Sequence, residues 1–159
     1  MDDKKDWNLE LSEYIKQGEP NQIEKTKVWE TAIGLQDVDG LKPSKYLIKT
    51  AKEHIEGNID IYEVKDRIDQ YYEVLDSKKD LEKEKSEEAD KVAVRITEIL
   101  SENTFNFSIA ELVNIHKRLF NGIFEGAGIF RDYNFTKKEW VLDGDTVIYS
   151  SFETIKDAL

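Results

Sequence analysis

The sequence predicts an all-α fold, a helical bundle, that carries one β-hairpin near its C-terminal end. Most of the 159 residues lie in charged segments whose apolar residues recur every three or four positions, as they do along one face of a helix. The segment KKEWVLDGDTVIYSS, from Lys137 to Ser151, differs because β-branched and aromatic residues flank an Asp-Gly pair there. Hydrophobic residues make up 39% and charged residues 36% of the chain, which is typical of helix-rich globular proteins rather than collagen-like or disordered ones.

The composition excludes several classes of function and location. Cysteine is absent, which removes disulfides, thiolate zinc sites and cysteine nucleophiles together. The formal charge of −11 argues against non-specific binding to nucleic acid, which needs clustered Lys and Arg. No apolar run reaches the length of a membrane span, and MDDKKDWNLE at the N-terminus lacks the apolar core of a secretion signal. We therefore expect a cytoplasmic protein with neither nucleic acid nor membrane as a partner.

Apolar spacing predicts four helices in the N-terminal half, over about 9–15, 22–38, 44–56 and 61–75. Gly18 and Pro20 separate the first two, and Gly57 is expected just after the C-cap of the third. Asp60 and Glu63 form an acidic variant of the capping box before the fourth helix. The apolar face of that helix consists of Ile61, Val64, Ile68, Leu75 and either Tyr71 or Tyr72.

A charged segment and three further helices are predicted in the rest of the chain. The segment from Asp76 to Lys91 carries charges of both signs, and it is consistent with a solvated helix start, a linker or an acidic recognition tail. It is also the best candidate for a domain boundary. The fifth helix ends near Leu100, a capping box at Ser108 opens a sixth that runs through Phe124, and SFETIKDAL indicates a further one. The sixth helix is expected to face inward with Leu112, Val113, His116, Leu119, Phe120 and Ile123.

The residues contain no complete active site. His116 lies on the apolar face of the sixth predicted helix, where a core or edge histidine is favoured over a catalytic base. His54 lies among charged residues, and we expect it to be exposed to solvent. Neither begins a metal-binding motif, and the sequence has no phosphate-binding glycine loop and no nucleophile elbow. We therefore assign no catalytic residue and no metal ligand in this chain.

Asp143-Gly144 indicates the turn of the hairpin, because both central residues of a type I′ turn need positive φ. A two-residue turn predicts that Leu142 pairs with Asp145, Val141 with Thr146, Trp140 with Val147 and Glu139 with Ile148. The outer edge of such a ribbon offers unpaired backbone groups, to which an extended peptide can add as a strand. A structural ribbon and a docking ribbon are both consistent with these residues.

The segment FSIAELVNIHKRLFNGIFEGAGIFRDYNFTK resembles the opening of the Fic fold, whose members typically read IHxxLFxxIYxWAGxxR before a β-hairpin. The matching positions are Ile115, His116, Leu119, Phe120, Ile123, Phe124, Ala127, Gly128 and Arg131, while Gly126 replaces the usual Trp. The similarity covers about Phe105 to Leu159. It implies that Lys138 to Ser150 form the Fic flap, which holds the target protein by strand addition.

Fic enzymes mostly transfer AMP from ATP, with Mg²⁺, to a hydroxyl side chain of another protein. Their hallmark HxFx(D/E)GN(G/K/T)R supplies the catalytic base, a metal carboxylate and phosphate-binding groups, and it lies some tens of residues beyond the flap. This sequence does not contain it. The resemblance therefore implies an N-terminal portion of a Fic protein that needs ATP and Mg²⁺ when complete. This chain holds no cofactor in that interpretation, and we predict that it is inactive alone.

The segment DGLKPSKYLIKTAKEHIEGNIDIYEVKDRIDQYY is similar to antitoxins of the VbhA type and to the regulatory segments fused to Fic domains. Their inhibitory helix carries (S/T)xxxE(G/N), whose Glu pairs with an Arg of the hallmark and blocks the γ-phosphate of ATP. Asp39 and Gly40 occupy the Glu-Gly positions, with Leu35 in place of Ser or Thr. A second alignment places Glu56-Gly57 there. Inhibition by this segment and a purely structural helix both remain open.

Together these patterns predict three regions: an antitoxin-like regulatory region over 1–76, a charged helix or linker over 77–104, and the N-terminal part of a Fic domain over 105–159. The predicted function is target docking for a Fic-type protein adenylyltransferase, together with autoinhibition if the inhibitory segment is active. The docking residues would be Trp140, Val141, Leu142, Asp143, Gly144, Asp145, Thr146, Val147 and Ile148. The alternative is a non-catalytic, antitoxin-like regulator or binding module of a separate Fic toxin. The sequence is also compatible with a homo-oligomer and with a helical scaffold that the hairpin completes.

Overall fold

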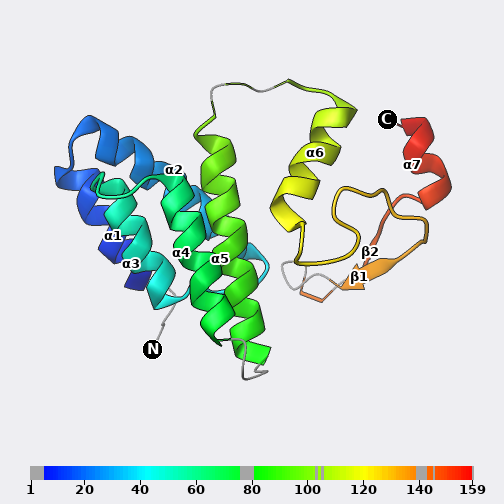
Figure 1. Cartoon of the computed structure of the whole chain (residues 1–159). Helices are drawn as coiled ribbons and strands as arrows, with labels where there is room; N and C mark the ends of the chain where they lie inside the picture. Colours follow the sequence, from blue (N-terminus) through cyan, green and yellow to red (C-terminus); the bar gives the residue numbers. More distant parts are fainter. Residues whose placement is uncertain are drawn as a thin grey trace. The chain divides into compact units, whose positions relative to one another are not determined.

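The computed structural model describes residues 6–75, 81–102, 104, 106–138, 143–144 and 146–158. The chain forms two compact units, residues 1–105 and residues 106–159 (Figure 1). The described part of the first unit is helical, and the second unit combines helices with a two-stranded antiparallel sheet. The predicted fold class, all-α with one β-hairpin, is therefore confirmed.

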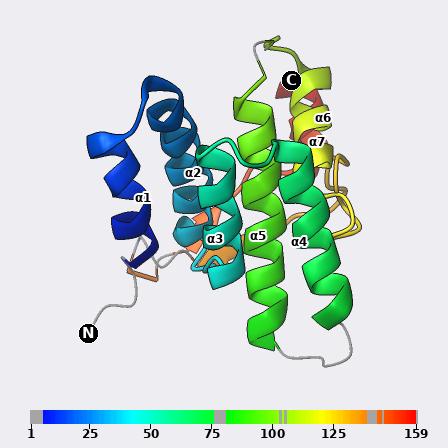
Figure 2. The ribbon, with the colours of Figure 1, turned by 60° about the vertical axis from the view of Figure 1, so that its left-hand side comes forward.

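The described residues of the first unit form five helices: α1 Asp6–Gln17, α2 Pro20–Val38, α3 Lys45–Ile55, α4 Ile61–Leu75 and α5 Leu81–Leu100. Helix α2 packs against α1, α3 and α5, and α5 also packs against α4 (Figure 2). The charged segment therefore continues from residue 81 as the start of α5, and this helix belongs to the bundle.

Glycines end two of these helices in the left-handed conformation. Gly40 follows α2 with φ of +71° and Gly57 follows α3 with φ of +82°. The N–H of Gly57 donates to the His54 carbonyl at 3.1 Å, and the N–H of Asn58 donates to the Glu53 carbonyl at 2.9 Å. These two bonds make a Schellman motif, which a residue without Cβ adopts most readily. The predicted role of Gly57 is confirmed.

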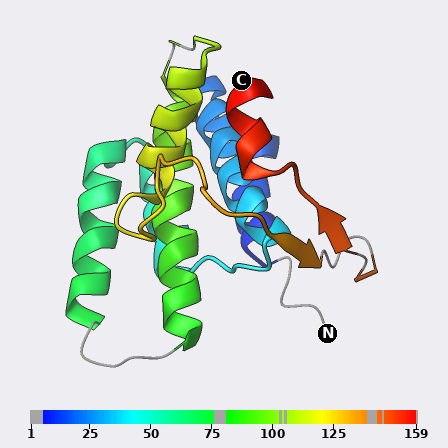
Figure 3. The ribbon, with the colours of Figure 1, turned by 90° about the vertical axis from the view of Figure 1, so that its right-hand side faces the viewer.

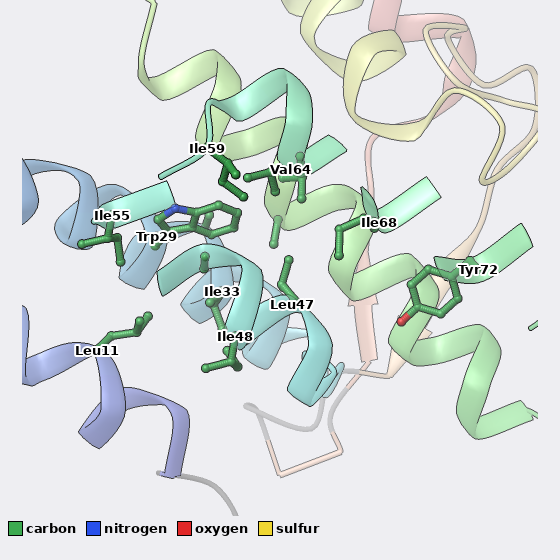
Figure 4. Packing of buried hydrophobic residues seen from close by; sticks show 14 residues of the cluster. Leu11, Trp29, Ile33, Leu47, Ile48, Ile55, Ile59, Val64, Ile68 and Tyr72 are labelled. Carbon is green, nitrogen blue, oxygen red and sulfur yellow. The ribbon is translucent and has the colours of Figure 1, made fainter. Parts of the chain in front are cut away.

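The core of the first unit forms around Trp29, whose side chain is fully buried. Figure 4 shows Trp29 among apolar side chains from the neighbouring helices. The buried cluster comprises Leu11, Trp29, Ala32, Ile33, Leu47, Ile48, Ala51, Ile55, Ile59, Val64, Ile68, Tyr72, Ala93 and Val94. Tyr72 is the tyrosine that α4 buries, while Tyr71 stacks on Tyr46 with ring centroids 4.3 Å apart. The predicted inward residues Val64 and Ile68 lie in this core, whereas Leu75 at the end of α4 is exposed, so the prediction for Leu75 was wrong.

The second unit contains α6 Ile109–Phe120, β1 Thr136–Lys138, β2 Thr146–Ile148 and α7 Phe152–Ala158 (Figure 3). Ser108 caps α6, because its Oγ accepts a hydrogen bond from the Glu111 N–H at 3.1 Å. None of the side chains described between residues 106 and 155 is buried. The apolar face of α6 that the sequence predicts as inward is therefore only half-buried or exposed.

The register of the hairpin differs from the predicted one. Thr146 pairs with Lys138, Val147 with Lys137 and Ile148 with Thr136, so the partner strand lies three residues earlier than a two-residue turn predicts. The same register continues into Phe135 and Tyr149, whose rings stack with centroids 4.6 Å apart. The Asp-Gly pair restricts backbone conformation only at the turn. The stacked aromatic pair lies at the other end of the hairpin, and it favours the observed register because only this register places the two rings opposite each other.

Within the residues that the structure describes, no helix is long and apolar enough to cross a membrane.

Candidate functional site

The hairpin of the second unit is the candidate docking site. Asp143 and Gly144 have φ of +53° and +87°, as a type I′ turn requires. Residues 146–148, the predicted second strand, form β2, and Ile148 exposes 84% of its surface. No third strand pairs with β1 or β2 among the described residues. The predicted docking residues Trp140, Val141, Leu142 and Asp145 lie outside the described part of the chain.

Arg131 holds the two ends of the hairpin together at its base. Its Nη1 donates to the Tyr133 carbonyl at 2.9 Å, just before β1, and its Nη2 donates to the Ser150 carbonyl, just after β2. The guanidinium carbon lies 4.9 Å from the centre of the Phe135 ring, at cation–π distance. Phe135 in turn stacks on Tyr149. The sequence identifies Arg131 only through its position in the AGxxR pattern, so its contacts are a result of the structure.

The loop that leads to Arg131 is bound to α6 through His116. The Gly128 N–H donates to His116 Nδ1 at 2.8 Å, so the neutral imidazole carries its proton on Nε2. Gly128 has φ of +75°, and a Cβ at this position would lie 2.6 Å from the Lys117 Cβ. The close approach of loop and helix therefore requires glycine. The His116 ring also contacts the rings of Phe120 and Phe124, with centroids 5.1 Å and 5.8 Å away.

His54 is buried and not exposed, so the prediction for this residue was wrong. Only 7% of its surface is accessible, and its Nδ1 accepts a hydrogen bond from the Trp29 indole N–H at 3.0 Å. Burial and then the positive charge of Lys25 lower the pKa of His54 to about 4. The neighbours of His54 in sequence are charged, which suggested an exposed side chain. In the helix, however, His54 lies on the same inward face of α3 as Leu47 and Ala51. His54 is a neutral core residue and not a candidate base.

Asp39 and Gly40, the predicted inhibitory pair, directly follow α2, which ends at Val38. Asp39 is the C-cap, with φ of −86°, and Gly40 adopts the left-handed conformation after it. Both residues are exposed. The second alignment assigns the inhibitory carboxylate to Glu56, and this carboxylate accepts a hydrogen bond from the Tyr14 hydroxyl of α1. Both carboxylates are exposed at the C-cap of a helix, and that of Glu56 already accepts a hydrogen bond within the first unit.

Asp90 of α5 forms a buried polar cluster that the sequence did not predict. Its carboxylate accepts hydrogen bonds from the Ser44 N–H at 2.8 Å, the Ser44 hydroxyl at 2.5 Å and the Tyr72 hydroxyl at 2.7 Å. Ser44 is the N-cap of α3, and Tyr72 lies on α4. Burial raises the pKa of Asp90 to about 6, although these hydrogen bonds act in the opposite direction. Asp90 lies four and seven residues before Val94 and Thr97, which are both buried, so helical spacing could have indicated that Asp90 is buried too.

Where the chain is described, no three His, Asp or Glu side chains gather as metal ligands would. Comparisons with protein-family models, with curated proteins and with solved structures find no match for this chain.

Proposed function

We propose that this chain forms the N-terminal part of a Fic-type protein adenylyltransferase, in which the hairpin docks the target protein and the first unit regulates the enzyme. Such an enzyme transfers AMP from ATP to a protein hydroxyl group. The proposal assigns ATP and Mg²⁺ to polypeptide that carries the Fic hallmark, because the 159 residues lack that motif. It rests on the resemblance of residues 105–159 to the Fic core and on the burial pattern of the second unit.

The observation that carries the proposal is the lack of buried side chains among the described residues of the second unit. Ile109, Leu112 and Phe124 expose 44%, 55% and 44% of their surfaces on α6 and just beyond it. Fully burying side chains of this kind contributes about 1.5–3 kcal/mol each. A two-stranded sheet is marginally stable alone. Further polypeptide packed against the apolar face of α6 would bury these side chains. The remainder of a Fic core would be such a polypeptide.

Strand addition at β2 is the docking mode that this hairpin favours. An exposed strand offers backbone N–H and C=O groups to an extended segment, and side chains on alternate faces then provide selectivity. Ile148 and Thr146 project on the same face of the ribbon because they are two residues apart. An apolar target residue opposite Ile148 would add about 0.2–1 kcal/mol as a cross-strand pair.

A regulator of a separate Fic toxin is the second candidate. The first unit has a buried core of its own, whose members run from Leu11 to Val94. Asp39 is exposed at the end of α2, where an arginine of another polypeptide could reach it. These two features favour a self-contained inhibitory module.

Labelled ATP distinguishes the two candidates. The chain alone should incorporate no label into itself or into candidate target proteins. Addition of a polypeptide that carries the hallmark should restore transfer if the chain docks targets, and Ile148→Glu should then reduce target labelling without reducing the helical content. Inhibition of an already active Fic toxin by the chain, relieved by Asp39→Ala, would favour the regulator instead. Robust labelling by the chain alone would refute both candidates.

A further inference from the structure

Two successive attachments connect the hairpin to α6 in the second unit. The first is the hydrogen bond from the Gly128 N–H to His116 Nδ1, at 2.8 Å, where the missing side chain of Gly128 lets the loop lie against Lys117. The second is Arg131, three residues further along, which donates to carbonyls on both sides of the hairpin. The contacts of Arg131 therefore lead back to α6 through one short stretch of chain. A separate hydrogen bond, from the Phe152 N–H to Asn134 Oδ1 at 2.8 Å, also joins the two sides of the base.

The side chains described in the hairpin beyond its base are mostly exposed. Both residues of the turn and all residues of β1 are exposed, and only Val147 of β2 is half-buried. An exposed two-stranded ribbon is only marginally stable by itself, so contacts at its base matter for its position. The described contacts that can orient its edges lie at its base: the hydrogen bonds and ring contact of Arg131, the stack of Phe135 on Tyr149, and the hydrogen bond between Phe152 and Asn134.

We propose that Arg131 is a positioning residue that fixes the orientation of the hairpin relative to α6, and that the His116–Gly128 hydrogen bond anchors the loop from which Arg131 acts. This inference rests on the proposed function for its purpose, since a docking edge held in one orientation loses less entropy when a strand is added. A guanidinium group suits this role because its planar fork of donors can reach two carbonyls at once. A lysine ammonium in the same place is a compact charge without that fork.

Spin labels attached to introduced cysteines measure this orientation directly. The chain has no native cysteine, so no other site would be labelled. Cysteines replace Asn114 on α6 and Lys138 on β1, both of which are exposed. Pulsed electron paramagnetic resonance then gives the distribution of distances between the labels in the full chain. Arg131→Gln should broaden the distribution about twofold or more, because the hairpin samples orientations that the two hydrogen bonds now exclude. His116→Phe, which keeps a ring but removes the acceptor, should broaden it as well.

Arg131→Lys separates geometry from charge, and Arg67→Gln is the matched control. Lysine should leave the distribution broader than in the unsubstituted chain, whereas a width fully restored by lysine would contradict the role of the two-carbonyl geometry. Arg67 pairs with Glu53 and Glu63 in the first unit, so its replacement changes the same charge and should leave the distribution unchanged.

Amide hydrogen exchange across 136–138 and 146–148 provides the second readout. Positioning predicts that Arg131→Gln broadens the distances while these amides keep their protection. Loss of their protection would show that Arg131 is needed to fold the hairpin and would overturn the positioning role, as would a distribution that Arg131→Gln does not change. Neither measurement uses a target protein or ATP, so failure of this inference is distinct from failure of the proposed function.

Discussion

Replacing Asp90 with asparagine should change how the stability of the first unit depends on pH. Asp90 is fully buried, and its carboxylate connects α5 to the N-cap of α3 and to Tyr72 of α4. Burial raises its pKa from the ordinary 3.8 to about 6. The folded chain therefore binds a proton at Asp90 more readily than the unfolded chain does.

The sign and size of the effect follow from this shift. Because the folded-state pKa is raised, the stability from Asp90 is complete below about pH 4 and is lost as the pH rises through about 6. A shift of about two pKa units corresponds to about 3 kcal/mol in the free energy of unfolding. Asparagine does not titrate, so the stability of Asp90→Asn relative to the unsubstituted chain should rise by about 3 kcal/mol across this window.

The measurement must be a difference between variants, because His54 acts in the opposite direction. Burial lowers the pKa of His54 from 6.5 to about 4, so its contribution is complete above about pH 6.5 and lost as the pH falls through about 4. The two effects oppose each other in the unsubstituted chain. Urea unfolding followed by circular dichroism at several pH values, on Asp90→Asn and on the exposed control Asp66→Asn, isolates the Asp90 contribution. A difference between Asp90→Asn and the unsubstituted chain that stays constant within about 0.5 kcal/mol would refute the reasoning.

Three further substitutions test separate contacts. His54→Phe leaves the Trp29 indole N–H without its acceptor, so urea unfolding should show a loss of about 1–3 kcal/mol, and an unchanged midpoint would contradict the hydrogen bond. Gly34→Ala should stabilise the chain by about 0.5–1 kcal/mol, because Gly34 lies inside α2 and a Cβ there meets no atom within 4 Å; destabilisation would be inconsistent with that open space. Gly128→Ala should displace the loop from α6, since its Cβ would lie 2.6 Å from that of Lys117, and backbone resonances near His116 should shift while those of the first unit do not. Resonances that stay in place would show that the loop does not need glycine.

Local patterns predicted the helices well because a helix depends on contacts within a few residues. The fourth predicted helix, 61–75, matches α4 in the structure. Gly57 and Ser108 are the predicted cap residues: Gly57 takes part in a Schellman motif, and the Ser108 hydroxyl accepts a hydrogen bond from the Glu111 N–H. The sixth helix ends at Phe120 and not at Phe124, and Gly122 adopts φ of +77° beyond that end. An apolar repeat can continue past the end of a helix when the following loop packs on the same face.

The sequence by itself determined the helices, their caps and the presence of an Asp-Gly turn, since each depends on the intrinsic preferences of neighbouring residues. Only the tertiary structure decided which polar side chains are buried and how the strands pair. Asp90 and His54 lie in charged sequence, yet both are buried because their helix faces meet partners distant in the chain. The register of the hairpin depends on the stacking of Phe135 on Tyr149 and on the hydrogen bonds of Arg131, and not on the turn alone. Helical spacing can place Asp90 and His54 on inward faces, but it does not identify the distant residues that they contact or the register of the strands, which is why these features required the folded chain.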